Sequence, residues 1–77
     1  MNSQENIKEL ERINKRLTPE QRKLLEQIIP DYNTRDVVGL EELLADELQT
    51  KGFGEDNDIN EYGAKILDLI DIVVDAY

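Results

Sequence analysis

Cysteine, histidine and tryptophan are all absent from this chain of 77 residues. Without cysteine the chain can form neither a disulfide bond nor a thiolate metal site. Without histidine it also lacks the usual zinc ligand and the side chain that most often acts as a general base near neutral pH. Neither a catalytic triad nor a set of metal ligands can be written from the residues that remain. We therefore expect no enzymatic activity, no metal and no cofactor.

Long apolar runs are absent as well. No run approaches the roughly 18 residues that a membrane span needs. The first residues, MNSQENIKELERI, lack the apolar segment of a secretory signal peptide. We therefore expect a soluble, cytoplasmic protein that does not enter membranes. With 39% apolar residues the chain can build a small core, and its length predicts a single domain over residues 1–77.

The second half of the chain has few basic residues to balance its acids. Residues 36–77 contain two Lys/Arg and twelve Asp/Glu, which gives a net charge of −10. Residues 1–35 contain seven Lys/Arg and six Asp/Glu, so the whole chain carries −9. An acidic field of this size repels nucleic acids and acidic lipids, and it attracts basic protein surfaces.

Helical periodicity is the main structural signal that the chain does contain. Apolar residues recur at intervals of three and four, which predicts an all-α fold, a compact bundle of about four short helices. The predicted segments cover residues from about 4 to 17, from 18 to about 29, from 34 or 36 to 51, and from 58 to the end. The last segment is the most apolar, so we expect it to be central to the core.

Two predicted helices begin with capping signals. Thr18 and Gln21 match a capping box, and Pro19 stands at the first helical position, where its missing N–H costs nothing. Asp58 is predicted to cap the last helix, with Glu61 as the acid three residues later. These signals predict that the second helix begins directly after Thr18 and the fourth directly after Asp58.

Two glycines suggest particular backbone features in the third segment. Gly39 lies inside the predicted helix, where glycine is unfavourable, so we expect a close approach of two helices at this position. Gly52 follows the predicted C-terminus, and Phe53 is placed to contact Leu48. This pattern predicts a Schellman motif that ends the helix.

The acidic loop before the last helix has the beginning of a calcium-binding pattern. Asp56, Asp58 and Asn60 match the first, third and fifth positions of an EF-hand loop. Glu61 stands where the turn of that loop requires glycine, and Leu67 stands where a bidentate glutamate is required. We therefore predict a solvated loop without a specific calcium site.

Residues 17–48 could be mistaken for a helix-turn-helix, but the second helix of that segment is acidic. Its carboxylates would meet DNA phosphates with like charge, whereas affinity for DNA comes largely from the opposite arrangement. The first helix has a basic face, which neighbouring acids dilute. The basic residues are Lys8, Arg12, Lys15 and Arg16. We expect no direct binding of nucleic acid.

A row of acids on the last helix is the strongest functional signal. Glu61, Asp68, Asp71 and Asp75 fall within roughly 80° of one another at 100° per residue. Aspartate is a poor helix former and negative charge is unfavourable near a helix C-terminus, so this row has a cost without visible compensation. Ile72 lies at its edge, which suits a contact patch with an apolar centre and a charged rim. A face that serves solubility alone is the alternative.

These observations favour a small acidic protein, without enzymatic activity, that binds a basic surface of a partner protein. Inhibitors of nucleic-acid enzymes, immunity proteins, antitoxins and small phage proteins that block a host factor fit this physical description. The expected contact residues are Glu41, Glu42, Asp46, Glu47, Asp68, Asp71, Ile72 and Asp75. The alternative is a structural or assembly role, as a homodimer or a subunit of a complex, because the wide apolar face of the last helix needs cover.

Overall fold

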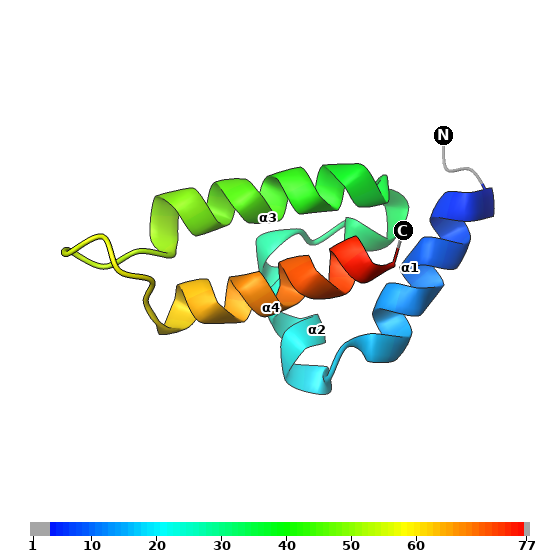
Figure 1. Cartoon of the computed structure of the whole chain (residues 1–77). Coiled ribbons are helices and arrows are strands. Elements are labelled where there is room, and N and C mark those ends of the chain that lie inside the picture. Colours follow the sequence, from blue (N-terminus) through cyan, green and yellow to red (C-terminus); the bar gives the residue numbers. More distant parts are fainter. Residues whose placement is uncertain (1–3, 77) are drawn as a thin grey trace.

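The computed structural model describes residues 4–76 and contains four α-helices (Figure 1). They are α1 (Gln4–Arg16), α2 (Pro19–Ile28), α3 (Val37–Lys51) and α4 (Glu61–Asp75), with a 3-10 turn, Tyr32–Thr34, between α2 and α3. The connection between α3 and α4 contains an isolated β-bridge. The prediction of an all-α bundle of four short helices is confirmed.

The antiparallel pair α3 and α4 forms the long axis of the molecule (Figure 1). The connection between the two helices projects at one end of this pair. At the other end, α1 lies beside the beginning of α3 and the end of α4 (Figure 1). The molecule is elongated as a result, with extents of 43 × 23 × 21 Å along its principal axes.

All four helices contribute to one hydrophobic core. The buried apolar residues are Leu10, Ile13, Leu17, Leu25, Ile29, Tyr32, Val37, Leu40, Leu44, Ile66, Leu69, Ile72, Val73 and Ala76. Five of these lie within α4 itself or at its C-cap, in agreement with the expected central place of this helix. Tyr32 brings the 3-10 turn into the core, and its hydroxyl donates a hydrogen bond of 2.7 Å to Oδ1 of Asn14 in α1.

The cap predicted for the start of α2 is present in the structure, whereas the one predicted for α4 is not. The capping box of α2 is confirmed, because the Gln21 N–H donates to the Thr18 hydroxyl and the Thr18 N–H donates to the Gln21 side chain. In α4 the predicted cap, Asp58, is wrong. Asn60 is the N-cap residue, and its Oδ1 accepts a 2.7 Å hydrogen bond from the Gly63 N–H. Asp58 instead accepts a backbone bond from Gly54 within the connection.

Asn6 in α1 caps the start of α3 across the fold. Asp36 occupies the N-cap position of α3, but its side chain makes no capping hydrogen bond. Oδ1 of Asn6 accepts a 2.8 Å bond from the Val37 N–H, and its Nδ2 donates to the Arg35 carbonyl at 3.0 Å. Asn6 is therefore a buried polar side chain with a structural purpose, since it supplies an acceptor to one of the unpaired N–H groups of the first helical turn.

The glycine predictions for α3 are both wrong. Apart from its chain neighbours and the backbone of its own helix turn, no described residue has an atom within 4 Å of the position that a Cβ would occupy on Gly39, so two helices do not approach closely there. Gly52 has φ −87° and not the left-handed conformation of a Schellman motif. The close approach occurs between Gly52 and Gly63, where a Cβ on Gly63 would clash with the Gly52 carbonyl oxygen.

Candidate partner-binding surface

The residues predicted to bind a partner differ widely in exposure. Five of the acids are exposed, two acids are partly buried, and the one apolar member is buried. The exposed acids are Glu42, Asp46, Asp68, Asp71 and Asp75, and the partly buried ones are Glu41 and Glu47. The sequence therefore predicted correctly that most of these carboxylates are exposed, but it did not show which of them make contacts within the molecule.

Ile72 does not form the apolar centre of a surface patch. It is only 7% exposed and belongs to the hydrophobic core. Leu69 and Ala76, three residues before it and four residues after it, are buried on the same side of α4. The buried face of α4 is wider than its apolar stripe alone suggested, because both α1 and α2 also pack against this helix.

Glu47 connects α3 to α4 inside the molecule. Its carboxylate accepts a 2.5 Å hydrogen bond from the Tyr62 hydroxyl, and the Lys51 ammonium lies 3.6 Å from the same oxygen. Burial, together with this hydrogen bond to a carboxylate, raises the pKa of Tyr62 to about 12. The Glu47 side chain is only 18% exposed, so it contributes little surface to a partner.

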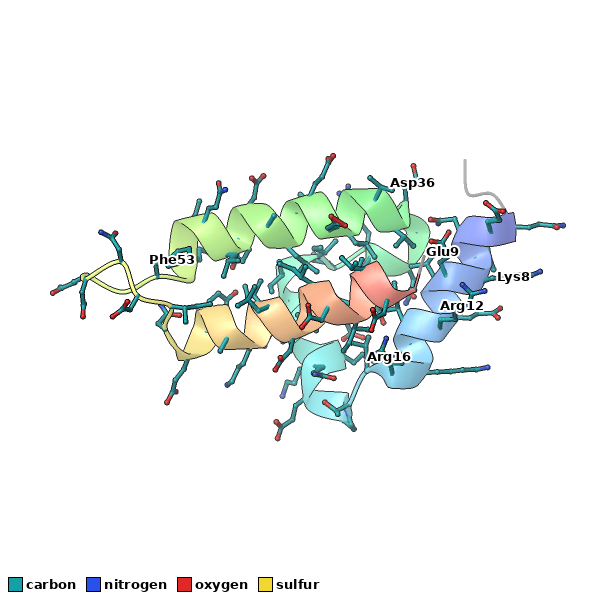
Figure 2. The ribbon with its side chains drawn as sticks, viewed as in Figure 1. Lys8, Glu9, Arg12, Arg16, Asp36 and Phe53 are labelled. Atoms are coloured by element: carbon teal, nitrogen blue, oxygen red, sulfur yellow. The ribbon has the colours of Figure 1, made fainter. Side chains whose placement is uncertain are left out.

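Two arginines of α1 contact the C-terminal end of α4, where negative charge was expected to be uncompensated. The Arg16 guanidinium forms a 3.0 Å ion pair with Asp75, and Nη1 of Arg12 donates a 2.8 Å hydrogen bond to the Ala76 carbonyl. Figure 2 labels both arginines on α1, beside this end of α4. A cation at a helix C-terminus interacts favourably with the helix dipole. The expectation of an uncompensated cost is therefore wrong for Asp75.

Four of the predicted contact carboxylates on α3 and α4 remain exposed without an ionic partner in the described chain. Among residues 4–76, neither Glu42 nor Asp46 on α3, nor Asp68 or Asp71 on α4, forms an ion pair. We call these four the outer carboxylates. Each helix directs them away from its buried face, and the two helices pack against each other, so the α3 pair and the α4 pair lie on outer sides of the molecule. In the described part of the chain, no three acidic side chains converge as a metal site would require.

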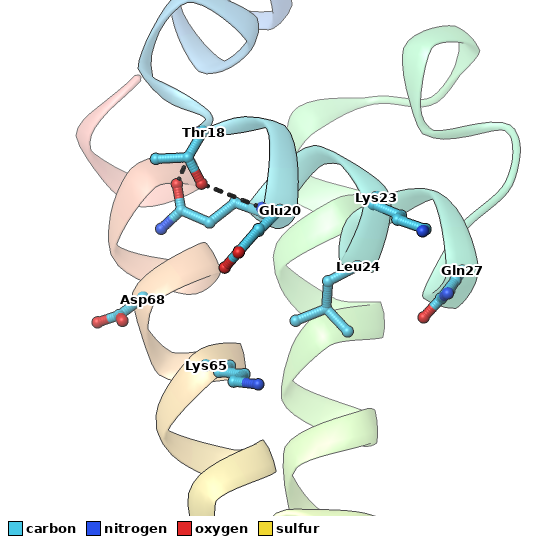
Figure 3. A pocket seen from close by; sticks show the side chains of 8 residues that line it. Thr18, Glu20, Lys23, Leu24, Gln27, Lys65 and Asp68 are labelled. Carbon is cyan, nitrogen blue, oxygen red and sulfur yellow. Dashed lines mark hydrogen bonds between the residues drawn. The ribbon is translucent and has the colours of Figure 1, made fainter.

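A shallow hollow of about 540 Å³ lies between α2 and the first half of α4. Figure 3 shows Lys23, Leu24 and Gln27 of α2 on one side of it and Lys65 and Asp68 of α4 on the other. Glu20 also lines the hollow, so its two lysines are balanced by two carboxylates. This mixed and open lining lacks the enclosed apolar walls that small-molecule sites usually have.

Within the described residues, no helix combines the length and the apolarity that crossing a bilayer requires. Comparison with protein-family models, with curated proteins and with solved structures finds no match for this chain. Any function must therefore be inferred from the surface of the molecule, and its most distinctive charged feature is the set of outer carboxylates.

Proposed function

We propose that this chain is a small cytoplasmic protein without enzymatic activity that binds a basic surface of another protein through its outer carboxylates. The observation that supports this most is that the arginines of α1 make contacts within the fold, whereas the outer carboxylates form no ion pair within residues 4–76. Cations of α1 serve the fold, since Arg16 pairs with Asp75 and Arg12 contacts the end of α4. The outer carboxylates, by contrast, are held on two packed helices and form no ion pair among the described residues.

Electrostatic steering followed by occlusion is the mechanism that fits this surface. A net charge of −9 concentrates a basic partner around the molecule and speeds encounter, and the effect weakens as salt screens the charges. Carboxylates on rigid helices can then occupy positions where the partner binds phosphates or acidic peptides. An inhibitor, an immunity protein or an antitoxin would work in this way.

Assembly with further copies or in a larger complex is the second candidate. Leu67 and Val74 of α4 are 39% and 41% exposed, and they lie seven residues apart on one side of the helix. An apolar stripe of this kind suits burial against another helix. A dimer whose stability does not depend on salt, observed by sedimentation, would favour this second function over the first.

Neutralising the outer carboxylates tests the proposed function. The variant carries Glu42→Gln, Asp46→Asn, Asp68→Asn and Asp71→Asn, and its matched control carries Glu5→Gln, Glu11→Gln, Glu20→Gln and Glu26→Gln. Both change the net charge by the same amount, and all eight side chains are exposed. A partner is first isolated from the source cell with the unmodified chain, identified, and purified for kinetic measurements.

We expect the outer-carboxylate variant to associate more slowly with that partner and to show a flatter dependence on salt than the control variant. If the control variant loses as much association rate as the test variant, only net charge matters and no surface is specific. If neither variant changes association, the proposed function is wrong.

A further inference from the structure

The connection between α3 and α4 carries an apolar pair at its base, next to the two helix caps. In this segment, residues 52–60, which we call the hairpin tip, Phe53 and Ile59 face each other in an antiparallel bridge. Backbone hydrogen bonds from Gly54 to Asp58 and from Asn60 to Gly52 flank the bridge at 2.8 and 2.9 Å. The two residues therefore form a non-hydrogen-bonded pair, whose side chains lie close together on the same face.

Both side chains of this pair are partly exposed to solvent. Phe53 is 46% exposed and Ile59 is 42% exposed, although each adjoins a helix that packs into the core. Figure 1 shows the hairpin tip projecting from the end of the α3–α4 pair that is distant from α1, and Figure 2 labels Phe53 there. The fold therefore covers about half of each side chain and leaves the other half accessible at the base of the projecting turn.

The backbone beneath the pair is closely held. The Gly52 carbonyl packs against the first turn of α4 so tightly that Gly63 has no room for a Cβ. The Asn60 side chain accepts from the Gly63 N–H and donates to the Lys51 carbonyl at 3.0 Å, which joins both helix ends to the tip. An apolar pair on such a preorganised support loses little conformational freedom when it binds.

Carboxylates surround the apolar pair, and the charges identify the chemistry of its partner. Glu55, Asp56 and Asp58 are exposed in the hairpin tip, and residues 52–64 contain no Lys or Arg. An apolar centre with a charged rim is typical of protein interfaces, and aromatic side chains often dominate their binding energy. A second copy of this chain would bring like charge against this rim, and an anionic lipid surface would do the same.

We propose that Phe53 and Ile59 insert into an apolar pocket with a basic rim on the partner protein, while the carboxylates of the hairpin tip contact that rim. This inference rests on the proposed function and specifies where the partner is anchored. The outer carboxylates would then guide the approach, and the hairpin tip would decide how long the complex lasts.

Photo-crosslinking from position 53 identifies what contacts the tip. The full chain carries p-benzoylphenylalanine in place of Phe53, and a control chain carries it in place of Val38, which is 59% exposed at the start of α3. In extracts of the source cell, we expect position 53 to crosslink one protein at an apolar site flanked by Lys or Arg. Crosslinks to lipid, to a second copy, or equally from both positions would overturn the proposal.

Affinity for the purified crosslinked protein then tests the apolar pair. We expect Phe53→Ala and Ile59→Thr each to weaken binding at least about tenfold, mainly through faster dissociation, as loss of a central anchor does. Val38→Ala serves as the control and should change affinity less than about twofold, because a scattered exposed residue outside the interface contributes little. Thermal melts of all three variants verify that they fold.

The outcomes separate this inference from the proposed function. Tip variants that bind like the unmodified chain, together with a weakened outer-carboxylate variant, overturn the tip as anchor and leave the proposed function standing. Weak tip variants with an unaffected outer-carboxylate variant overturn the proposed function and leave the hairpin tip as the site of contact. If both sets bind normally, both proposals fail.

Discussion

At the residue scale, Asn6 of α1 supplies the cap for the start of α3 that the residue at the N-cap position, Asp36, does not supply. Its carboxamide accepts from the Val37 N–H and donates to the Arg35 carbonyl, so it replaces water at the buried start of another helix. A side chain 31 positions away in the chain supplies this cap. No local pattern predicts it, because the capping signals of a sequence are read within one helical turn.

Replacing Asn6 should therefore cost more stability than replacing the residue at the N-cap position. Asn6→Ala leaves a buried N–H without its acceptor, and we expect a loss of about 1–3 kcal/mol in the free energy of unfolding. Asp36→Ala removes no side-chain capping bond and should cost less than about 1 kcal/mol, from the helix dipole alone. Urea denaturation measures both values, and a larger loss for Asp36→Ala would contradict this assignment.

The two helical glycines offer a matched comparison at the same scale. A Cβ on Gly63 would meet the backbone of Gly52, which cannot rotate away, so Gly63→Ala should destabilise by about 1–3 kcal/mol. A Cβ on Gly39 would meet no atom of another helix within 4 Å, so Gly39→Ala should stabilise by about 0.5–1 kcal/mol. Thermal melts test whether the two substitutions shift the unfolding midpoint in opposite directions. Equal shifts of the two midpoints would show that the Gly52–Gly63 contact is not close in solution.

At the scale of elements, the sequence predicted what depends on neighbours along the chain. The helical periods, the capping box at Thr18 and the end of α3 near Lys51 were all readable in this way. The predictions for Ile72 and Gly39 were wrong because both depend on the packing of other helices. Other helices bury Ile72, and none approaches Gly39. The binding role of the outer carboxylates stays a prediction, since no feature of a single chain shows what it binds.

The stability of the C-terminal end of α4 should depend on its contacts with α1. Arg12→Gln removes a charged donor from the Ala76 carbonyl, and we expect a loss of about 1 kcal/mol at low salt. Lys15→Gln is the control, because Lys15 is an exposed cation of the same helix. The difference between the two variants should shrink in high salt, as thermal melts can show. Two variants of equal stability at low salt would mean that the Arg12 contact contributes nothing.

The contact between α3 and α4 should respond to alkaline pH. The pKa of Tyr62 is raised from 10.0 to about 12, chiefly by burial, so the folded chain keeps a proton that the unfolded chain releases. This contribution to stability is complete below pH 10 and is lost as the pH rises toward 12. Tyr62→Phe cannot titrate, so the stability difference between the unmodified chain and this variant should narrow in that interval. A constant difference in urea midpoints across the interval would contradict the shift.

At the scale of the whole molecule, a core of this size leaves a narrow margin of stability. A single core in so short a chain supplies roughly 3–5 kcal/mol. Ile66 is fully buried, so Ile66→Ala should cost about 2–5 kcal/mol and leave much of the population unfolded. Ile70 is only partly buried, and Ile70→Ala should cost clearly less. Circular dichroism during heating distinguishes the two, and equal melting would show that α4 faces the core differently.

The position of α1 has a consequence for the order in which the chain assembles and opens. α3 and α4 are joined by a short connection, so their pairing closes a small loop and can form early. α1 contacts both open ends of that pair, through Asn6 at the start of α3 and through Arg12 at the end of α4. Detachment of this one helix would release both ends together, and amide hydrogens at Val37 would then exchange with solvent in the same event that frees the last carbonyls of α4.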